Sequence, residues 1–95
     1  MFLSTYHFAG ETTELVAGYD RLVGMLPAGE ITLNICVQRP DGISVYDVCP
    51  TEADFLAFSR GPDFAAALQA AGLHAPRIEP LGEIHALIGL PASVS

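Results

Sequence analysis

The sequence has 95 residues, 51% of them hydrophobic, and its length suits one domain, residues 1–95. Eleven acidic residues, four arginines and no lysine give a net charge of −7, which argues against binding to nucleic acid or to an anionic membrane. No stretch reaches the ~20 apolar residues of a membrane span, and the first residues lack the basic region of a signal peptide, so we expect a cytoplasmic protein.

The first part of the chain predicts a strand and then a helix. Residues 1–8 are rich in aromatic and β-branched side chains, which favour a strand. Residues 11–26 predict a helix that is capped by Thr12 or Thr13 and ended by the Pro-Ala-Gly sequence at 27–29. Apolar residues recur in it at helical spacing and form one stripe: Leu15, Tyr19, Leu22, Val23 and Leu26.

The middle of the chain predicts a β-hairpin. Within residues 31–38 the apolar side chains alternate strictly with polar or small ones, the pattern of a strand with two different faces: Ile31, Leu33, Ile35 and Val37 against Thr32, Asn34, Cys36 and Gln38. The Arg-Pro-Asp-Gly sequence at 39–42 is typical of a turn. Residues 43–49 then return as the second strand of the hairpin.

The last part of the chain predicts a helix and a final strand. Residues 51–54 resemble a capping box, and Gly61-Pro62 should bend or interrupt the helix that follows. The helix resumes over residues 64–71 and ends at Gly72. We expect the last strand over residues 78–90, with a possible break near Pro80.

This order of elements, βαββαβ, predicts the α+β class and a ferredoxin-like fold. Both strand-helix-strand crossovers are right-handed, so the two helices lie on one face of a four-stranded antiparallel sheet. The other face is then uncovered and needs shielding or polar side chains. The excess of hydrophobic residues favours a homodimer in which two such faces meet, and a monomer with an apolar surface is the alternative.

Pairing Gln38 with Ile43 sets the register of the hairpin, because cross-strand partners share a face. The side chains that then share the face without helices are Thr32, Asn34, Cys36, Asp47 and Cys49. A slip by one residue would turn Asp47 toward the helices, where an unpaired charge is unfavourable. In this register Cys36 and Cys49 are not opposite each other, and no disulfide is expected.

Two ionisable residues are candidates for acid–base chemistry in such a cavity. Asp47 would act as a general base if burial raises its pKa, whereas a carboxylate paired with an arginine or with backbone amides would be structural. His85 lies between apolar neighbours in the expected last strand and would point toward the same cavity, unless it is only a partly exposed interface residue.

Further candidates would contact a substrate. Asn34 and Cys49 share the face of Asp47, and either Tyr6 or His7 reaches the cavity, but not both, because they alternate on one strand. The scattered His and Cys residues predict no metal site, and the absence of a phosphate-binding loop implies no nucleotide cofactor.

The pattern resembles the dimeric α+β barrel superfamily, in particular small proteins akin to antibiotic-biosynthesis monooxygenases. The residues that carry the resemblance are Tyr19-Asp20-Arg21, Asp41-Gly42, Asp47-Val48, Thr51-Glu52 with Phe55 and Phe58, Ala67-Leu68, Ala71-Gly72-Leu73 and His85. Relatives often have Trp where Cys49 stands, and the haem-degrading branch has Trp and His where Phe58 and Leu68 stand. Haem degradation is therefore not expected.

The resemblance implies a cofactor-independent enzyme that oxygenates or cyclises an aromatic or polyketide-like substrate in a barrel cavity. A base would deprotonate a phenol or enol, and Asn34 with Tyr6 or Tyr46 would hydrogen-bond to the developing oxyanion. The alternative is a non-catalytic dimer that binds an apolar small molecule or another protein.

Overall fold

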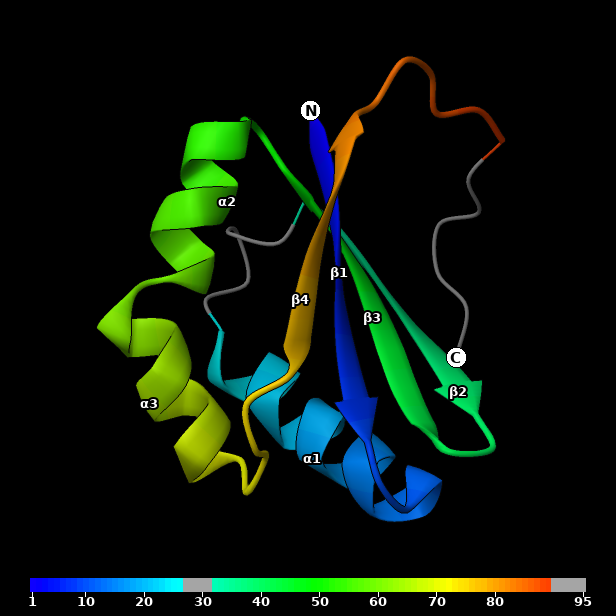
Figure 1. Cartoon of the computed structure of the whole chain (residues 1–95), viewed down its shortest axis with the longest axis vertical. Helices are drawn as coiled ribbons and strands as arrows, with labels where there is room; N and C mark the ends of the chain where they lie inside the picture. Colours follow the sequence, from blue (N-terminus) through cyan, green and yellow to red (C-terminus); the bar gives the residue numbers. More distant parts are fainter. Residues whose placement is uncertain (27–31, 90–95) are drawn as a thin grey trace.

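One antiparallel sheet and three helices on one of its faces make up the described part of the chain, residues 1–26 and 32–89, in this computed structural model (Figure 1). The elements in chain order are β1 (Phe2–Ala9), α1 (Thr12–Met25), β2 (Leu33–Arg39), β3 (Gly42–Cys49), α2 (Glu52–Ser59), α3 (Pro62–Ala70) and β4 (Arg77–Glu83). The strands lie in the order β2-β3-β1-β4, which is the ferredoxin-like arrangement. The predicted α+β class and fold are confirmed.

The first helix begins where the sequence predicts, but its cap is a different residue. The Glu11 carboxylate accepts the backbone N–H groups of Thr13 and Glu14 at 3.2 and 2.8 Å. The hydroxyl of Thr12 donates instead to the carbonyl of Arg39, which ties the start of α1 to the hairpin turn. The prediction of a threonine cap is therefore wrong, because that hydroxyl has a tertiary partner. The Pro-Ala-Gly sequence at 27–29, which was predicted to end this helix, lies outside the described residues.

The predicted interruption at Gly61-Pro62 is confirmed, and it divides the second helical segment into α2 and α3. The Thr51 hydroxyl caps α2 by accepting the N–H of Asp54 at 3.1 Å. The helix α3 ends in a Schellman motif, in which Gly72 has φ +78° and Leu73 donates its N–H to the carbonyl of Leu68 at 2.9 Å. This turn directs both leucine side chains into the core.

The hairpin register is the predicted one, with Gln38 opposite Ile43 and Asn34 opposite Asp47. Gly42 follows the turn, and a Cβ there would lie 2.0 Å from the carbonyl oxygen of Phe8, so no larger residue fits without moving backbone. Thr32 precedes β2, and Ile31 lies outside the described residues.

The faces of the sheet are assigned the wrong way round by the sequence prediction. The side chains of Asn34 and Asp47 point toward the helices, where the Tyr19 hydroxyl of α1 donates to Asn34. The apolar side chains of β2 lie on the open face, and two of them are exposed, Ile35 by 45% and Val37 by 39%. Tyr46 lies opposite Ile35 on that open face, on the other side of the sheet from Asn34.

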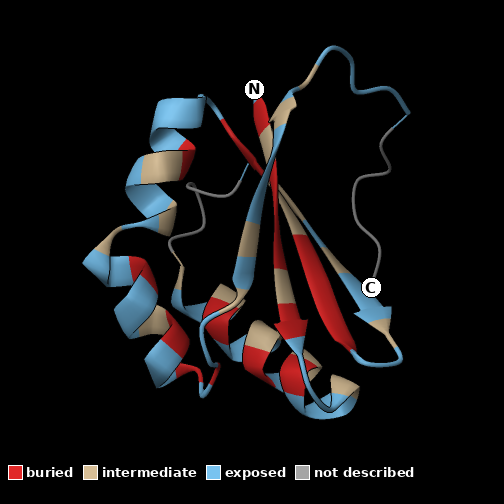
Figure 2. Ribbon diagram, in the orientation of Figure 1, coloured by how far each residue is buried: buried red, intermediate tan, exposed pale blue. Residues whose placement is uncertain are grey.

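The core lies between the helices and the two central strands, β1 and β3 (Figure 2). Phe2 and Tyr6 of β1 meet the ring of Phe55 of α2 at centroid distances of 5.3 and 6.4 Å. The Tyr6 ring also meets that of Phe64 of α3, at 5.5 Å, edge to face. These contacts fix α2 and α3 over the middle of the sheet.

The last strand is shorter than predicted. β4 ends at Glu83, and its pairing with β1 shifts register between Leu3 and Ser4, opposite Pro80 to Gly82. An edge strand tolerates proline there because its N–H need not bond to a neighbour. His85 lies beyond the strand and is exposed, so the prediction that it belongs to the last strand is wrong.

Candidate functional site

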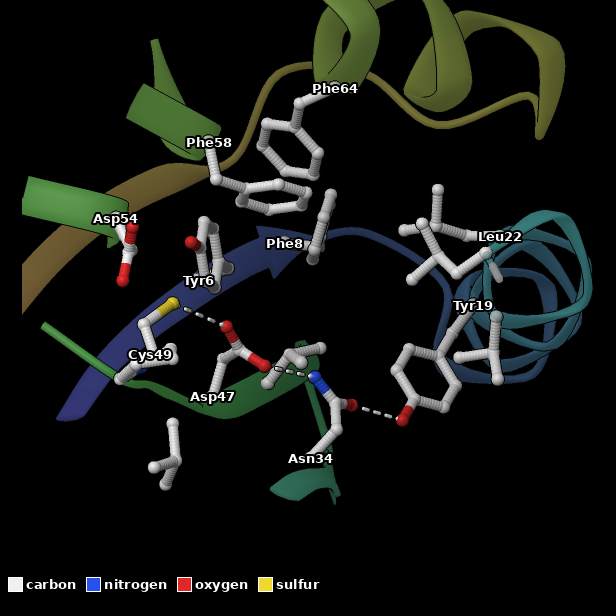
Figure 3. Close-up of a pocket in the computed structure, with 15 residues that line it drawn as sticks. Tyr6, Phe8, Tyr19, Leu22, Asn34, Asp47, Cys49, Asp54, Phe58 and Phe64 are labelled. Atoms are coloured by element: carbon white, nitrogen blue, oxygen red, sulfur yellow. Dashed lines mark hydrogen bonds between the residues drawn. The ribbon is translucent and has the colours of Figure 1, made fainter. Parts of the chain in front are cut away.

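A cavity of about 200 Å³ lies between the helices and the face of the sheet that carries Asp47 (Figure 3). Its walls are mainly apolar and include five aromatic side chains, Tyr6, Phe8, Tyr19, Phe58 and Phe64. An engineered apolar cavity of about 150 Å³ holds benzene, so this volume suits a ligand of one or two rings. The cavity is therefore on the helix side of the sheet and within a single copy of the chain.

The polar part of the cavity is one chain of hydrogen bonds that runs from α1 across β2 to β3. The Tyr19 hydroxyl donates to Oδ1 of Asn34, whose Nδ2 donates to Oδ1 of Asp47 at 3.0 Å. The other oxygen of Asp47 accepts the thiol of Cys49 at 3.4 Å. The hairpin register places Asn34 directly opposite Asp47, and Cys49 is two residues along the same face of β3. The carboxylate is thus held in one orientation from both sides.

Burial controls the protonation of the side chains that form this series of hydrogen bonds. It raises the pKa of Asp47 above its ordinary value, and the hydrogen bonds from Asn34 and Cys49 only partly oppose it. The pKa of Cys49 is raised to about 12 by burial and by the charge of Asp47, so Cys49 is a thiol donor and not a nucleophile at neutral pH. Burial likewise raises the pKa of Tyr19 to about 12 and keeps it a hydroxyl donor.

Tyr6 supplies a hydroxyl with no hydrogen-bond partner among the described residues. The residue is only 3% exposed. Burial raises the pKa of its phenol above the usual value, and the nearby Ser4 side chain only partly opposes this rise. Ser4, its neighbour on the same face of β1, donates its own hydroxyl to the carbonyl of Asp47 at 3.5 Å. A buried, unpaired hydroxyl is unfavourable for folding and calls for an explanation. Because Tyr6 lines the cavity, a ligand would supply its partner (Figure 3).

The three histidines lie outside the cavity. Between Tyr6 and His7, Tyr6 lines it, while His7 lies on the open face with Nδ1 2.8 Å from Ser44 Oγ and Nε2 3.4 Å from Glu79 Oε1. This order of groups is that of a Ser-His-Glu triad, but Ser44 is 2% exposed, so its oxygen is not accessible to a substrate. His74 packs against Phe8, and His85 is exposed beyond β4.

The structure therefore brings together four of the residues proposed from the sequence, Tyr6, Asn34, Asp47 and Cys49, and separates His7 and His85 from them. Sequence reasoning missed Tyr19 as a site residue and included it only in the apolar stripe of α1 and among the residues that carry the family resemblance. The sequence feature that could have identified it is a hydroxyl group on a helical stripe otherwise made of Leu and Val. Phe58 and Phe64 were also missed as walls of a cavity.

Within residues 1–26 and 32–89 no three His, Cys, Asp or Glu side chains are grouped so that they could hold a metal ion. Both cysteines are free, as predicted. None of the helices described is both long and apolar enough to cross a membrane.

The fold and the cavity define an α+β domain of ferredoxin-like type with a pocket between sheet and helices. No family model matches the chain, and no curated protein matches it. The functional argument therefore rests on the chemistry of the pocket.

Proposed function

We propose that the chain is a small-molecule enzyme in which Asp47 is a general base that deprotonates an aromatic or enolisable ligand in the pocket. The observation that carries this proposal is a carboxylate oriented by hydrogen bonds, with a pKa raised by burial, in an apolar cavity of about 200 Å³. A raised pKa makes a carboxylate a stronger base, and exclusion of water strengthens its action on a bound proton.

Tyr6 is proposed to stabilise the anion that forms. Its hydroxyl is neutral, buried and unpaired, so it can donate to an oxygen on which negative charge develops. Asn34 and Tyr19 do not act on the substrate in this scheme. They hold the carboxylate so that its remaining lone pairs face the cavity.

Deprotonation of a phenol or enol is the common first step of cofactor-independent oxygenation and cyclisation. The resemblance to small monooxygenase-like α+β barrel proteins supports this reaction class. The size of the cavity favours one- or two-ring substrates over larger polycyclic ones. Non-catalytic binding of an apolar ligand is the competing function, and turnover distinguishes the two.

The test uses 5-nitrobenzisoxazole, a two-ring probe that reports on general bases. Its ring C–H proton passes to the base, the N–O bond breaks, and the electron pair ends on a phenolate oxygen. We expect the wild-type protein to accelerate this reaction and 2-naphthol to inhibit it by occupying the same cavity. Binding of 2-naphthol without acceleration would favour the non-catalytic function, and neither effect would contradict the proposal.

Replacing Tyr6 by Phe separates function from stability. The variant removes an unpaired buried hydroxyl, so we expect the free energy of unfolding to stay the same or to rise, by up to about 1–3 kcal/mol. The rate with the benzisoxazole probe should fall by about 10²-fold, because one donor to the phenolate is lost. Urea denaturation and turnover on the same samples check both. A rate equal to that of the wild type would remove Tyr6 from the site.

We also propose that the open face of the sheet is covered by a second copy of the chain. Ile35 and Val37 are exposed on the edge strand β2, beside Leu33 and Tyr46 on the same face. Arg77 and Glu79 lie on the same face at the opposite edge of the sheet, on β4, and carry opposite signs, which suits a two-fold interface that meets itself. Burying such a face would use the hydrophobic excess of the chain.

The Ile35→Glu variant tests this interface. We expect the wild type to sediment as a dimer at micromolar concentration and the variant as a monomer, because a buried unpaired carboxylate is unfavourable. Met25→Glu is the matched control, since Met25 is 45% exposed and lies on α1, in the other layer. A monomeric wild type, or dissociation of the control to the same extent, would contradict the proposal.

A further inference from the structure

We propose that the ligand of the pocket carries a cationic amine, and that it is a hydroxylated arylalkylamine whose ammonium group lies at the mouth of the pocket between Asp54 and Phe58. This inference deepens the proposed function and depends on it. It follows from the side chains that line the cavity, from the geometry of its mouth and from the unpaired hydroxyl of Tyr6.

The charges of the lining have a single sign. The cavity is lined by two carboxylates, Asp47 and Asp54, and by five aromatic rings. None of the described residues that line it is an Arg or a His. A carboxylate or phosphate on the ligand would be repelled there and would find no counter-charge. A net charge of −7 over the chain adds a field that concentrates organic cations near the mouth.

The mouth has the two groups that bind an organic ammonium. Asp54 is exposed in the first turn of α2, and Phe58 follows it four residues later, so both lie on one side of the helix. The Phe58 ring is held against the Phe64 ring, with centroids 4.6 Å apart, and stays 37% exposed. Figure 3 shows both Asp54 and Phe58 at the border of the cavity. An ammonium there would contact a carboxylate and a ring edge or face together.

The Tyr6 hydroxyl independently indicates a ligand with a polar atom. Tyr6 is 3% exposed and lines the cavity, and its buried hydroxyl has no hydrogen-bond partner among the described residues. A phenolic hydroxyl on the ligand would exchange hydrogen bonds with Tyr6 and offer its proton to Asp47. The aromatic ring would then lie among the apolar walls, with the amine chain directed outward.

Three isosteric probes with one phenol ring and different charge test the inference: tyramine is a cation, tyrosol is neutral and 4-hydroxyphenylacetate is an anion. In calorimetric titrations of the wild type we expect tyramine to bind about three- to tenfold more tightly than tyrosol, the range of an exposed ion pair with a cation–π contact. The anion should bind more weakly than tyrosol. Added salt should reduce the preference for tyramine and leave tyrosol binding unchanged.

Asp54→Asn should reduce the preference for tyramine over tyrosol, because only the contact with Phe58 and the net charge of the chain remain to favour the cation, and it should not alter tyrosol binding. The backbone N–H of residue 54 still donates to Thr51 in this variant, and the asparagine carbonyl can accept the Thr51 hydroxyl as Asp54 Oδ2 does at 3.0 Å, so the start of α2 is retained. Asp63→Asn is the control, because Asp63 is an exposed acid at the start of α3 that does not line the pocket. It should keep the full preference for tyramine.

The outcomes separate this inference from the proposed function. If the wild type binds tyramine and tyrosol equally, or if Asp54→Asn keeps the preference, the inference is wrong while the pocket still binds aromatic ligands. If none of the three probes binds although 2-naphthol inhibits the benzisoxazole reaction, only the inference fails; if there is neither acceleration nor inhibition by 2-naphthol, the proposed function fails as well.

Discussion

Replacing Asp47 by Asn is expected to lower the rate with 5-nitrobenzisoxazole by about 10²- to 10⁴-fold, the usual contribution of a positioned general base. Asparagine has nearly the same shape, and its carbonyl can still accept the N–H of Asn34. It has no basic oxygen, however, so the ring proton of the probe has no acceptor. The initial rate of phenolate release, measured at equal protein concentration, checks the result.

Asp41→Asn is the matched control for this loss. Asp41 is an exposed carboxylate in the hairpin turn, 3.4 Å from Arg39 and outside the pocket, so its replacement should leave the rate unchanged. Surface pairs of this kind contribute little to stability. Equal rates in the wild type and in Asp47→Asn would exclude Asp47 as the base.

Replacing Asp47 by Asn should also increase the stability of the fold, and the size of this increase should depend on pH. Because burial raises the pKa of Asp47, the folded state holds its proton to higher pH than the unfolded state does. The wild type therefore loses stability as pH rises from the ordinary carboxyl pKa through the raised one, and Asp47→Asn does not. The difference in melting temperature between Asp47→Asn and the wild type should be larger at pH 7 than at pH 3, and at pH 7 the variant should be the more stable of the two.

Truncating Phe55 to Ala is expected to reduce the free energy of unfolding by about 3–5 kcal/mol. The ring is 2% exposed and packs between Phe2 and Tyr6, at centroid distances of 5.3 and 6.4 Å, so its loss leaves a cavity between α2 and β1. A domain of this size has a total stability of about 5–15 kcal/mol, so the variant should be close to unfolding. Urea denaturation followed by circular dichroism measures the change.

Phe55→Leu is the control for this prediction, since it keeps an apolar side chain and should lose about 1.5 kcal/mol or less. If both variants are as stable as the wild type, Phe55 does not fix α2 against the sheet. The packing that forms the wall of the pocket would then need a different explanation.

Local patterns were sufficient to predict the elements and the hairpin register. The alternation in residues 33–38, the turn at 39–42 and the breaker at Gly61-Pro62 each act over a few residues, and each is found in the structure. The orientation of the sheet was not predictable in the same way. We assumed that the apolar side of β2 faces the helices, but β2 is an edge strand, and there the helices cover a pocket instead of a packed core.

The candidate site was predicted only in part, because some of its contacts follow from the hairpin register and others depend on tertiary packing. The register alone brings Asn34 to Asp47 and aligns Cys49 with them, whichever face they occupy. Tyr19 joins them through the packing of α1 on the sheet, which no sequence spacing specifies. His85 was misplaced because the apolar residues after Glu83 continue a strand-like pattern, although β4 ends at that residue.

The central claim is that the Asp47 carboxyl group faces an aromatic ligand in a desolvated pocket. A carbon-13 NMR titration of its carboxyl resonance, with and without 2-naphthol, tests this directly, and Asp47→Asn identifies the signal. We predict a midpoint above the ordinary value of 3.8 and a change in the resonance when the ligand binds. A midpoint at or below 3.8 with no response to the ligand would contradict the account.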